Sequence, residues 1–222
     1  MQTTDSVENI FARSWTLLAR NPVIVVPGIV VGLATGIILF FYPDAWMSAL
    51  IGVLAYVITQ SYVVGMAGAA WRNGRTTLAD GAAVFSQDAV RVLLTMLLFA
   101  VIGVVLTILT FGIGWLVFLF FAIYTIPAVI LGNMTPFDGL KRSFSLAMDR
   151  LVTTLIIVAL LFLINLVVGL LSFPLALIPL LGPIISGIIS QAIVAYATLV
   201  IVGEYLVPDK LPAAVVPPGP PT

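Results

Sequence analysis

The sequence contains no cysteine and no histidine, and charged residues make up only 8% of its 222 positions. Without cysteine the chain cannot form disulfides, thiolate metal sites or a cysteine nucleophile. Without histidine it lacks the usual zinc and haem ligand, the usual proton shuttle near neutral pH and the base of a serine triad. The glycines do not form a phosphate-binding loop. We therefore expect no enzymatic activity, no cofactor and no bound metal.

Apolar residues are abundant instead, at 62% of the chain. A soluble domain is about half apolar and about a quarter charged, so lipid must cover much of this surface. Nine basic residues balance nine acidic ones, and we expect no nucleic-acid partner. The acidic start, residues 1–5, lacks the basic residues of a signal peptide, so we expect no cleaved leader.

Six apolar segments are long enough to cross a bilayer as helices, which requires about 20 residues each. Runs such as residues 155–162 do not alternate between apolar and polar, as strands of a membrane barrel would. The sequence therefore predicts an all-α fold, a polytopic membrane helix bundle of six transmembrane helices. The predicted spans are Pro22 to Phe41, Trp46 to Ala70, Val90 to Leu109, Gly114 to Asn133, Leu151 to Ser172, and Ile184 to Leu206.

The basic residues all fall on one side of this arrangement. The opposite loops, near residues 42–44, 110–113 and 172–183, contain no lysine or arginine. Because short cytoplasmic loops carry the excess of basic residues, we expect a multi-pass protein of the cell membrane with both termini in the cytoplasm. Tryptophans near both predicted interfaces are consistent with this register.

A short amphipathic segment precedes each odd-numbered span and opens with a helix-capping pattern, at residues 5–8, 77–80 and 135–138. We therefore predict three repeats of an interfacial amphipathic helix plus a transmembrane hairpin. Such a helix beside a membrane usually lies in the headgroup layer. The alternative is an ordinary connector packed on the bundle. On the interfacial interpretation, membrane lipids are partners, and the headgroup candidates are Arg13, Arg20, Lys141, Arg142 and Arg150.

Uncharged polar residues enter the predicted hydrocarbon core, chiefly Gln60, Tyr62, Asn165 and Gln191. They would either line a path for a solute or lipid, or form hydrogen bonds between helices, and the second use is favoured. Glu204, near the end of the last span, would be either a proton or cation site or a solvated carboxylate, and the solvated state is favoured.

Small residues spaced four apart let helices approach closely, and we assign Gly28, Gly32, Gly36 and Gly65 to helix packing. Pro127 should kink the fourth span. Pro174, Pro179 and Pro183 interrupt the loop before the sixth span, where residues 175–181 are a candidate re-entrant segment.

The stretch Gly139-Leu140-Lys141-Arg142-Ser143-Phe144-Ser145-Leu146 before a long apolar helix resembles a pattern in poorly characterised six-span families of bacteria and archaea. These families look like the membrane domain attached to some glycerophosphoryl diester phosphodiesterases. The last span, opened by Gly182-Pro183 and containing Gln191 and Tyr205, is similar too. The chain has no room for the hydrolase domain of the fused proteins, so the resemblance implies a membrane module without an assigned reaction.

Residues 1–207 should form the membrane domain and residues 208–222 a proline-rich, flexible cytoplasmic tail. The leading hypothesis is a non-enzymatic membrane protein that acts through lipid or protein-partner contacts, as an accessory subunit, scaffold or bilayer organiser. A protein partner would bind in the membrane or through the tail. The alternative is a small solute or lipid transporter, which should show a water-accessible cavity lined by the intramembrane polar residues.

Overall fold

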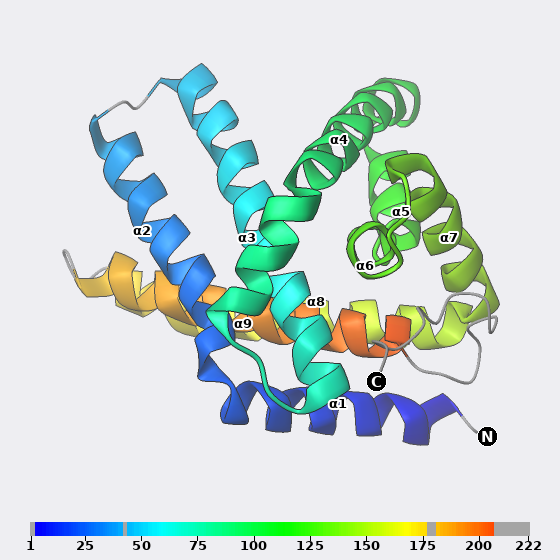
Figure 1. Ribbon diagram of the computed structural model, residues 1–222. Helices are drawn as coiled ribbons and strands as arrows, with labels where there is room; N and C mark the ends of the chain where they lie inside the picture. Colours follow the sequence, from blue (N-terminus) through cyan, green and yellow to red (C-terminus); the bar gives the residue numbers. More distant parts are fainter. Residues whose placement is uncertain (1–2, 42–43, 177–180, 207–222) are drawn as a thin grey trace.

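The computed structural model describes residues 3–41, 44–176 and 181–206, which are helical with short connections and contain no strand (Figure 1). The elements in chain order are α1 (Thr3–Arg20), the 3-10 helix η1 (Pro22–Val25), α2 (Val26–Phe41), α3 (Ala45–Asn73), α4 (Leu78–Thr110), α5 (Ile113–Phe121), α6 (Thr125–Leu131), α7 (Pro136–Asp149), α8 (Leu151–Ala176) and α9 (Leu181–Leu206).

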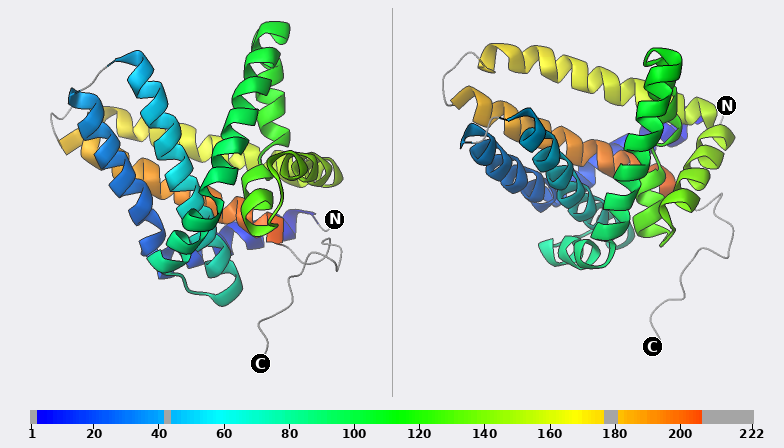
Figure 2. Two further views of the ribbon diagram at one scale, coloured as in Figure 1. Left: turned by 45° about the horizontal axis from the view of Figure 1, so that its top comes forward. Right: turned by 90° about the horizontal axis from the view of Figure 1, so that it is seen from above.

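Three helical hairpins diverge from a common region, as Figures 1 and 2 show: α2 with α3, α4 with α5, and α8 with α9. We call the region where they converge the base. It comprises α1, the C-terminal end of α3, the connection between α3 and α4, the N-terminal half of α4, α6, α7, the start of α8 and the C-terminal end of α9. The described part of the chain starts and finishes there (Figure 1).

Five helices in the described residues are long and apolar enough to cross a membrane. A sixth span is reached if η1 and α2 are counted together with α1, from which they are bent by 90°. The sequence prediction of an all-helical fold with several membrane-crossing helices is therefore confirmed. The predicted first span coincides with η1 and α2, and the predicted second, third and sixth spans lie within α3, α4 and α9.

Asn21 holds the sharp corner between α1 and η1. Its position before Pro22 disfavours helical backbone, so α1 ends there. The buried Asn21 amide donates to the carbonyls of Leu17 at 2.9 Å and Gly74 at 3.3 Å, and its Oδ1 accepts from the backbone N–H of Thr76 at 3.0 Å. One side chain thus ties the corner to the connection between α3 and α4.

The predicted fourth span is broken into α5 and α6, as Pro127 requires. Proline has no N–H for the carbonyl four residues earlier, here that of Ile123, and its ring clashes with that carbonyl. Ser143 of α7 supplies partners at the break: its hydroxyl donates to the Phe121 carbonyl at 2.6 Å and accepts from the Tyr124 N–H at 3.0 Å. Side-chain hydroxyls that satisfy backbone groups in this way make a broken helix tolerable in lipid.

The three amphipathic segments do not adopt one common structure. The first is the separate helix α1, which begins at Thr3, so residues 5–8 lie inside the helix and not at its start. The second continues without a break into the 33-residue α4, although Asp80 does accept the Thr77 backbone N–H at 2.7 Å as the capping pattern predicts. The third is the separate helix α7, capped by Thr135. The prediction of a separate amphipathic helix is therefore wrong for the middle segment.

The loop between α8 and α9 differs from the prediction in its bounds. Helix α8 extends through Pro174 to Ala176, past the predicted end at Ser172, and α9 already begins at Leu181. The rest of the candidate re-entrant segment lies outside the described residues, as does the proline-rich tail.

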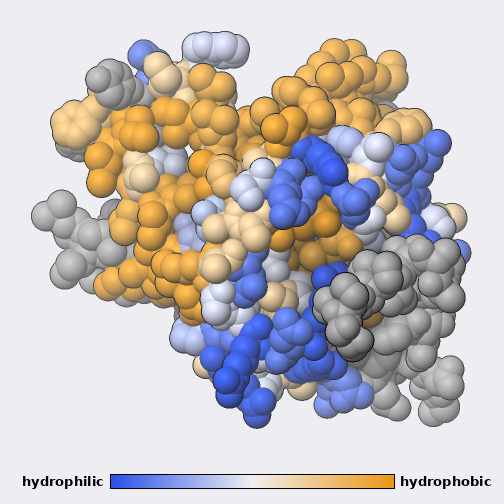
Figure 3. All heavy atoms as spheres, viewed as in Figure 1, coloured by the Kyte–Doolittle hydropathy of each residue, from blue (hydrophilic) through white to orange (hydrophobic). Residues whose placement is uncertain are grey.

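The protein core lies near the base, whereas the far parts of the hairpins expose apolar side chains. In α3 the buried residues begin only at Val57, and they pack with α9 and η1. Figure 3 shows apolar residues over the projecting ends of α2–α3 and α4–α5. The largest exposed ones include Ile37, Phe41, Trp46, Val101, Ile108, Leu109 and Leu116. Water would not solvate such a surface favourably, so it is suited to lipid.

Candidate functional site

The basic residues of the described chain gather at the base. No lysine or arginine occurs at positions 21–71, 92–140 or 151–209, which cover the projecting parts of all three hairpins. In Figure 3 hydrophilic residues accordingly cover much of the lower half of the molecule. The base is thus the one region of the described chain where an anionic headgroup would meet positive charge.

Helix α1 uses its apolar face for packing on the bundle. Val7 and Ile10 are buried against α8 and α9, and Leu17 belongs to the main core. Arg13 donates to the Trp71 carbonyl at 3.1 Å and stacks over the Trp71 ring at 4.4 Å. For α1 the connector interpretation therefore fits better than insertion into lipid. Its basic residue Arg13 already has a protein partner.

Helix α7 exposes apolar and basic side chains on one face. Phe137 is 57% exposed and Met148 62% exposed, and Phe144 lies between them with its ring partly stacked on the bundle. The Lys141 ammonium lies on the same face, 4.6 Å from the Phe137 ring. An exposed stripe of this kind, apolar with a flexible lysine, matches the interfacial helices of membrane proteins.

The opposite face of α7 is buried, and its small residues pack toward α6 and the break before it. Ser143 and Ala147 are fully buried, and a Cβ added to Gly139 would lie 2.6 Å from Val129 of α6. Gly139 and Ser143 belong to the stretch Gly139–Leu146 that precedes the apolar helix α8. In this structure they hold α7 against the broken span and so fix which face of α7 points outward.

The remaining headgroup candidates differ in their surroundings. Arg20 is exposed at the end of α1, and Arg142 is half-buried on α7. Arg150 is buried, so we remove it from the headgroup candidates. Among the five, Lys141 combines exposure with exposed apolar neighbours, and Arg142 follows it on the same helix.

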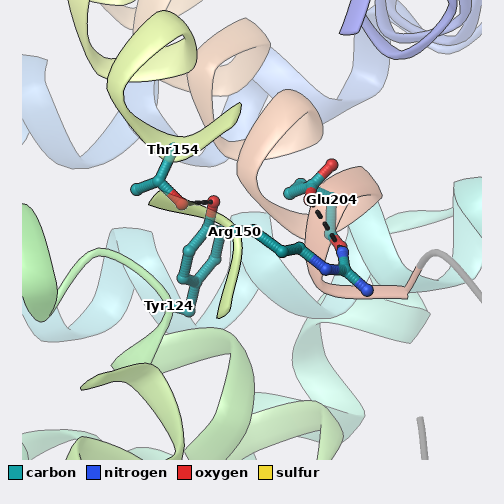
Figure 4. A network of polar contacts seen from close by, with 4 residues as sticks. All are labelled: Tyr124, Arg150, Thr154 and Glu204. Atoms are coloured by element: carbon teal, nitrogen blue, oxygen red, sulfur yellow. Dashed lines mark hydrogen bonds and ion pairs between the residues drawn. The ribbon is translucent and has the colours of Figure 1, made fainter. Parts of the chain in front are cut away.

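Arg150 and Glu204 form a buried ion pair between the start of α8 and the end of α9 (Figure 4). Their side chains are only 6% and 4% exposed. Arg150 Nη1 donates to Glu204 Oε1 at 2.7 Å and to the Glu204 backbone carbonyl at 2.9 Å. The expectation that Glu204 is solvated is therefore wrong, because its carboxylate faces a guanidinium inside the protein. A buried charge needs such a partner, and removing either one is costly.

A second polar contact lies beside the ion pair. The hydroxyls of Tyr124 and Thr154 are 3.1 Å apart, and both residues are fully buried (Figure 4). This contact joins α8 to the break before α6. The ion pair joins α8 and α9 at the base end of the third hairpin, and the Tyr124–Thr154 contact links that hairpin to the break before α6. Among the described residues, the buried Arg150 Nε and Tyr205 hydroxyl have no hydrogen-bond partner.

Two of the four intramembrane polar residues line a cavity. Gln60 of α3 and Asn165 of α8 border a cavity of about 250 Å³ between α3, α4, α5, α6, α8 and α9. Tyr56 and Thr198 also contribute to its wall, which is otherwise apolar. Gln60 and Asn165 therefore face the cavity and, among the described residues, do not form the expected hydrogen bonds to a neighbouring helix. Asn165 donates within α8, to the Leu161 carbonyl at 2.8 Å.

The other two intramembrane polar residues, Tyr62 and Gln191, lie outside this cavity. The Tyr62 ring packs on Phe85 of α4, with ring centroids 5.5 Å apart. Gln191 of α9 lies against Gly28 of α2, where even a Cβ would collide with its side chain. The structure thus separates a pair that borders the cavity from a pair that packs between helices.

The glycines assigned to helix packing behave differently from one another. Gly28 is in close contact with α9, and a Cβ at Gly65 would lie 2.7 Å from Val84 of α4. A Cβ at Gly32 would make only ordinary contact, and one at Gly36 would meet nothing within 4 Å. Close approach of helices therefore occurs at Gly28 and Gly65, near the base, whereas the helices diverge by Gly36.

Sequence reasoning missed the Arg150–Glu204 pair and the role of Ser143. The only signal for the pair was that each charge sits at the base end of an apolar helix in the same hairpin, so antiparallel packing brings them together. In the described part of the chain no three acidic side chains gather closely enough to hold a metal ion.

Comparisons of this chain with family models, with curated proteins and with solved structures found no match. The inferences below therefore rest on the residues and their geometry.

Proposed function

We propose that this chain is a six-span protein of the cell membrane, with both ends in the cytoplasm, that acts without catalysis through contacts of its base with anionic lipid. It would serve as an accessory subunit, scaffold or bilayer organiser, and any protein partner would bind beside it in the membrane or at the tail. The observation that carries this proposal is the exposed face of α7, where Lys141 lies between Phe137 and Met148.

The chemistry of that face fits a bilayer surface. The aromatic and methionine side chains would enter the acyl boundary, while the lysine extends its ammonium to the phosphates. Each basic residue near an anionic surface contributes about 1 kcal/mol of attraction. Lys141 and Arg142 together would therefore contribute about 2 kcal/mol, or about thirtyfold in affinity for anionic over neutral lipid.

The test is a double substitution on α7, Lys141→Gln with Arg142→Gln. We expect it to reduce the anionic lipid that co-purifies with the protein, measured by mass spectrometry, without changing the thermal unfolding temperature in detergent. The matched control exchanges the two residues, Lys141→Arg with Arg142→Lys, and should retain the lipid because the charge is kept. An unchanged lipid complement in the Gln variant would contradict the proposal.

The cavity beside Gln60 and Asn165 favours a second candidate function, transport of a small solute or lipid. A transporter site near the middle of the spans should be reachable by water. The test places single cysteines at Gln60, Tyr62, Asn165 and Gln191 and measures their reaction with a water-soluble thiol reagent. Strong labelling at two or more of the four would support transport, and little labelling would support the non-transporting function proposed first.

A further inference from the structure

We propose that the cavity between α3, α4, α5, α6, α8 and α9 binds one chain of an uncharged, hydroxyl-bearing lipid of the diacylglycerol class. This inference does not depend on the α7 contacts, because none of the described residues that line the cavity belongs to α7. It concerns a binding site inside the protein, and it requires no transport.

The size of the cavity suits a single lipid chain. Its volume of about 250 Å³ corresponds to about eight water molecules at about 30 Å³ each. Pockets that enclose a whole drug-sized molecule are usually larger, about 300–1,000 Å³. A chain segment with its first polar group would fill this space, and the rest of the lipid would remain in the bilayer.

The cavity is open at one side and closed at the other. Its inner wall includes Val64, Ala122 and Thr198, which are all buried. Its outer edge includes Tyr56, 44% exposed, and Leu119, 41% exposed. Tyr56 lies near the middle of α3 and Leu119 lies in the apolar helix α5, so a ligand would enter sideways from the lipid.

The polar atoms in the cavity are uncharged and only partly used. Gln60 has no hydrogen-bond partner among the described residues, so its amide can both donate and accept. Asn165 donates one side-chain N–H to the Leu161 carbonyl, and its Oδ1 remains free to accept a hydrogen bond. The Thr198 hydroxyl is already engaged by the Val194 carbonyl at 2.8 Å. A ligand with one hydroxyl and nearby ester carbonyls would satisfy both free amide groups.

The absence of charge selects against phospholipids. No lysine, arginine, aspartate or glutamate is among the residues that line the cavity. A phosphate brought here would be desolvated without a counter-charge, which is strongly unfavourable. The polar group that fits is therefore neutral, and the anionic lipid proposed for α7 would bind at a different place.

The experiment uses the full chain in lipid nanodiscs with trace amounts of photoactivatable lipids. The probes carry a diazirine on the same acyl chain in diacylglycerol, in phosphatidylglycerol and in a plain alkane. We expect diacylglycerol to label peptides from the cavity walls in α3 and α9 at least fivefold more than phosphatidylglycerol does. Equal labelling by these two lipids, or no labelling of the cavity peptides above that of the outer helix surfaces, would overturn the proposal.

Filling the cavity provides the second arm. Ala197→Phe, and separately Val194→Phe, should reduce diacylglycerol labelling of the α3 cavity peptide at least fivefold. The matched control is Ala159→Phe, which adds the same volume on the exposed face of α8 and should leave labelling unchanged. Two filling variants are used so that one remains informative if the other unfolds. Unchanged labelling in a folded filling variant would contradict the site.

The third arm tests the polar recognition. Gln60→Leu should lower the preference for diacylglycerol over the alkane probe about fivefold, which is about 1 kcal/mol at 1.4 kcal/mol per tenfold. Tyr62→Phe, near Gln60 on α3 but outside the cavity, is the control and should retain the preference. A Gln60→Leu protein with the full preference would show that the amide does not recognise the lipid.

Discussion

Replacing Arg150 by methionine tests whether the buried ion pair holds α8 and α9 together at the base end of the third hairpin. The guanidinium and the Glu204 carboxylate are almost completely buried and 2.7 Å apart. Methionine keeps much of the length of the side chain but leaves Glu204 as a buried charge without a partner. The expected cost is about 3–5 kcal/mol of the free energy of unfolding. Glu204→Leu should cost a similar amount, because it leaves the Arg150 guanidinium buried without a partner.

The double variant distinguishes a pair from two independent side chains. In the double variant, Arg150→Met with Glu204→Leu, the site is apolar and no ion is left without a partner. The loss in the free energy of unfolding should therefore lie well below the sum of the losses of the two single variants. The difference between that sum and the double-variant cost is the coupling energy. For neighbours in direct contact we expect a coupling of at least about 1 kcal/mol.

The assay is reversible unfolding in mixed micelles, with the folded fraction followed as SDS is increased. Arg72→Met is the control, because Arg72 is exposed at the end of α3, and it should change the free energy of unfolding by no more than about 0.5 kcal/mol. Additive single costs, or single costs no larger than that of the control, would refute the argument that Arg150 and Glu204 compensate one another inside the protein.

Two further predictions concern helix packing. Ser143→Ala should lower the free energy of unfolding by about 1–3 kcal/mol, because it leaves the backbone groups at the α5–α6 break without their side-chain partner. Ser145→Ala, on the exposed side of α7, should be nearly neutral in the same unfolding assay. Gly65→Ala should cost about 1–3 kcal/mol through its collision with Val84, and Gly36→Ala should be neutral or stabilising by up to about 1 kcal/mol; equal effects at the two glycines would contradict the packing described.

Features that depend on local sequence could be predicted. Continuous apolar runs of about 20 residues indicate membrane-crossing helices whatever their neighbours are. The break near Pro127 follows from the missing N–H of one residue, and the Thr135 cap follows from a pattern of four residues. These signals are local, so no knowledge of the tertiary structure was needed.

Features that depend on which helices meet could not be predicted. An amphipathic pattern has the same period whether its apolar face meets lipid or protein, so the sequence did not show that α1 packs on α8 and α9 while α7 exposes its stripe. The cavity needs Gln60 and Asn165 to come from helices more than 100 positions apart in the chain. The ion pair similarly depends on the antiparallel pairing of α8 with α9.

Cysteine labelling in intact cells tests whether the basic base faces the cytoplasm while the hairpins cross the membrane. The chain has no native cysteine, so single substitutions report one position each. Asp44→Cys, at the far end of the first hairpin, should react with an impermeant thiol reagent, and Asn73→Cys, exposed at the base, should react only after the cells are permeabilised. Labelling of Asn73→Cys in intact cells, with Asp44→Cys protected, would contradict the orientation.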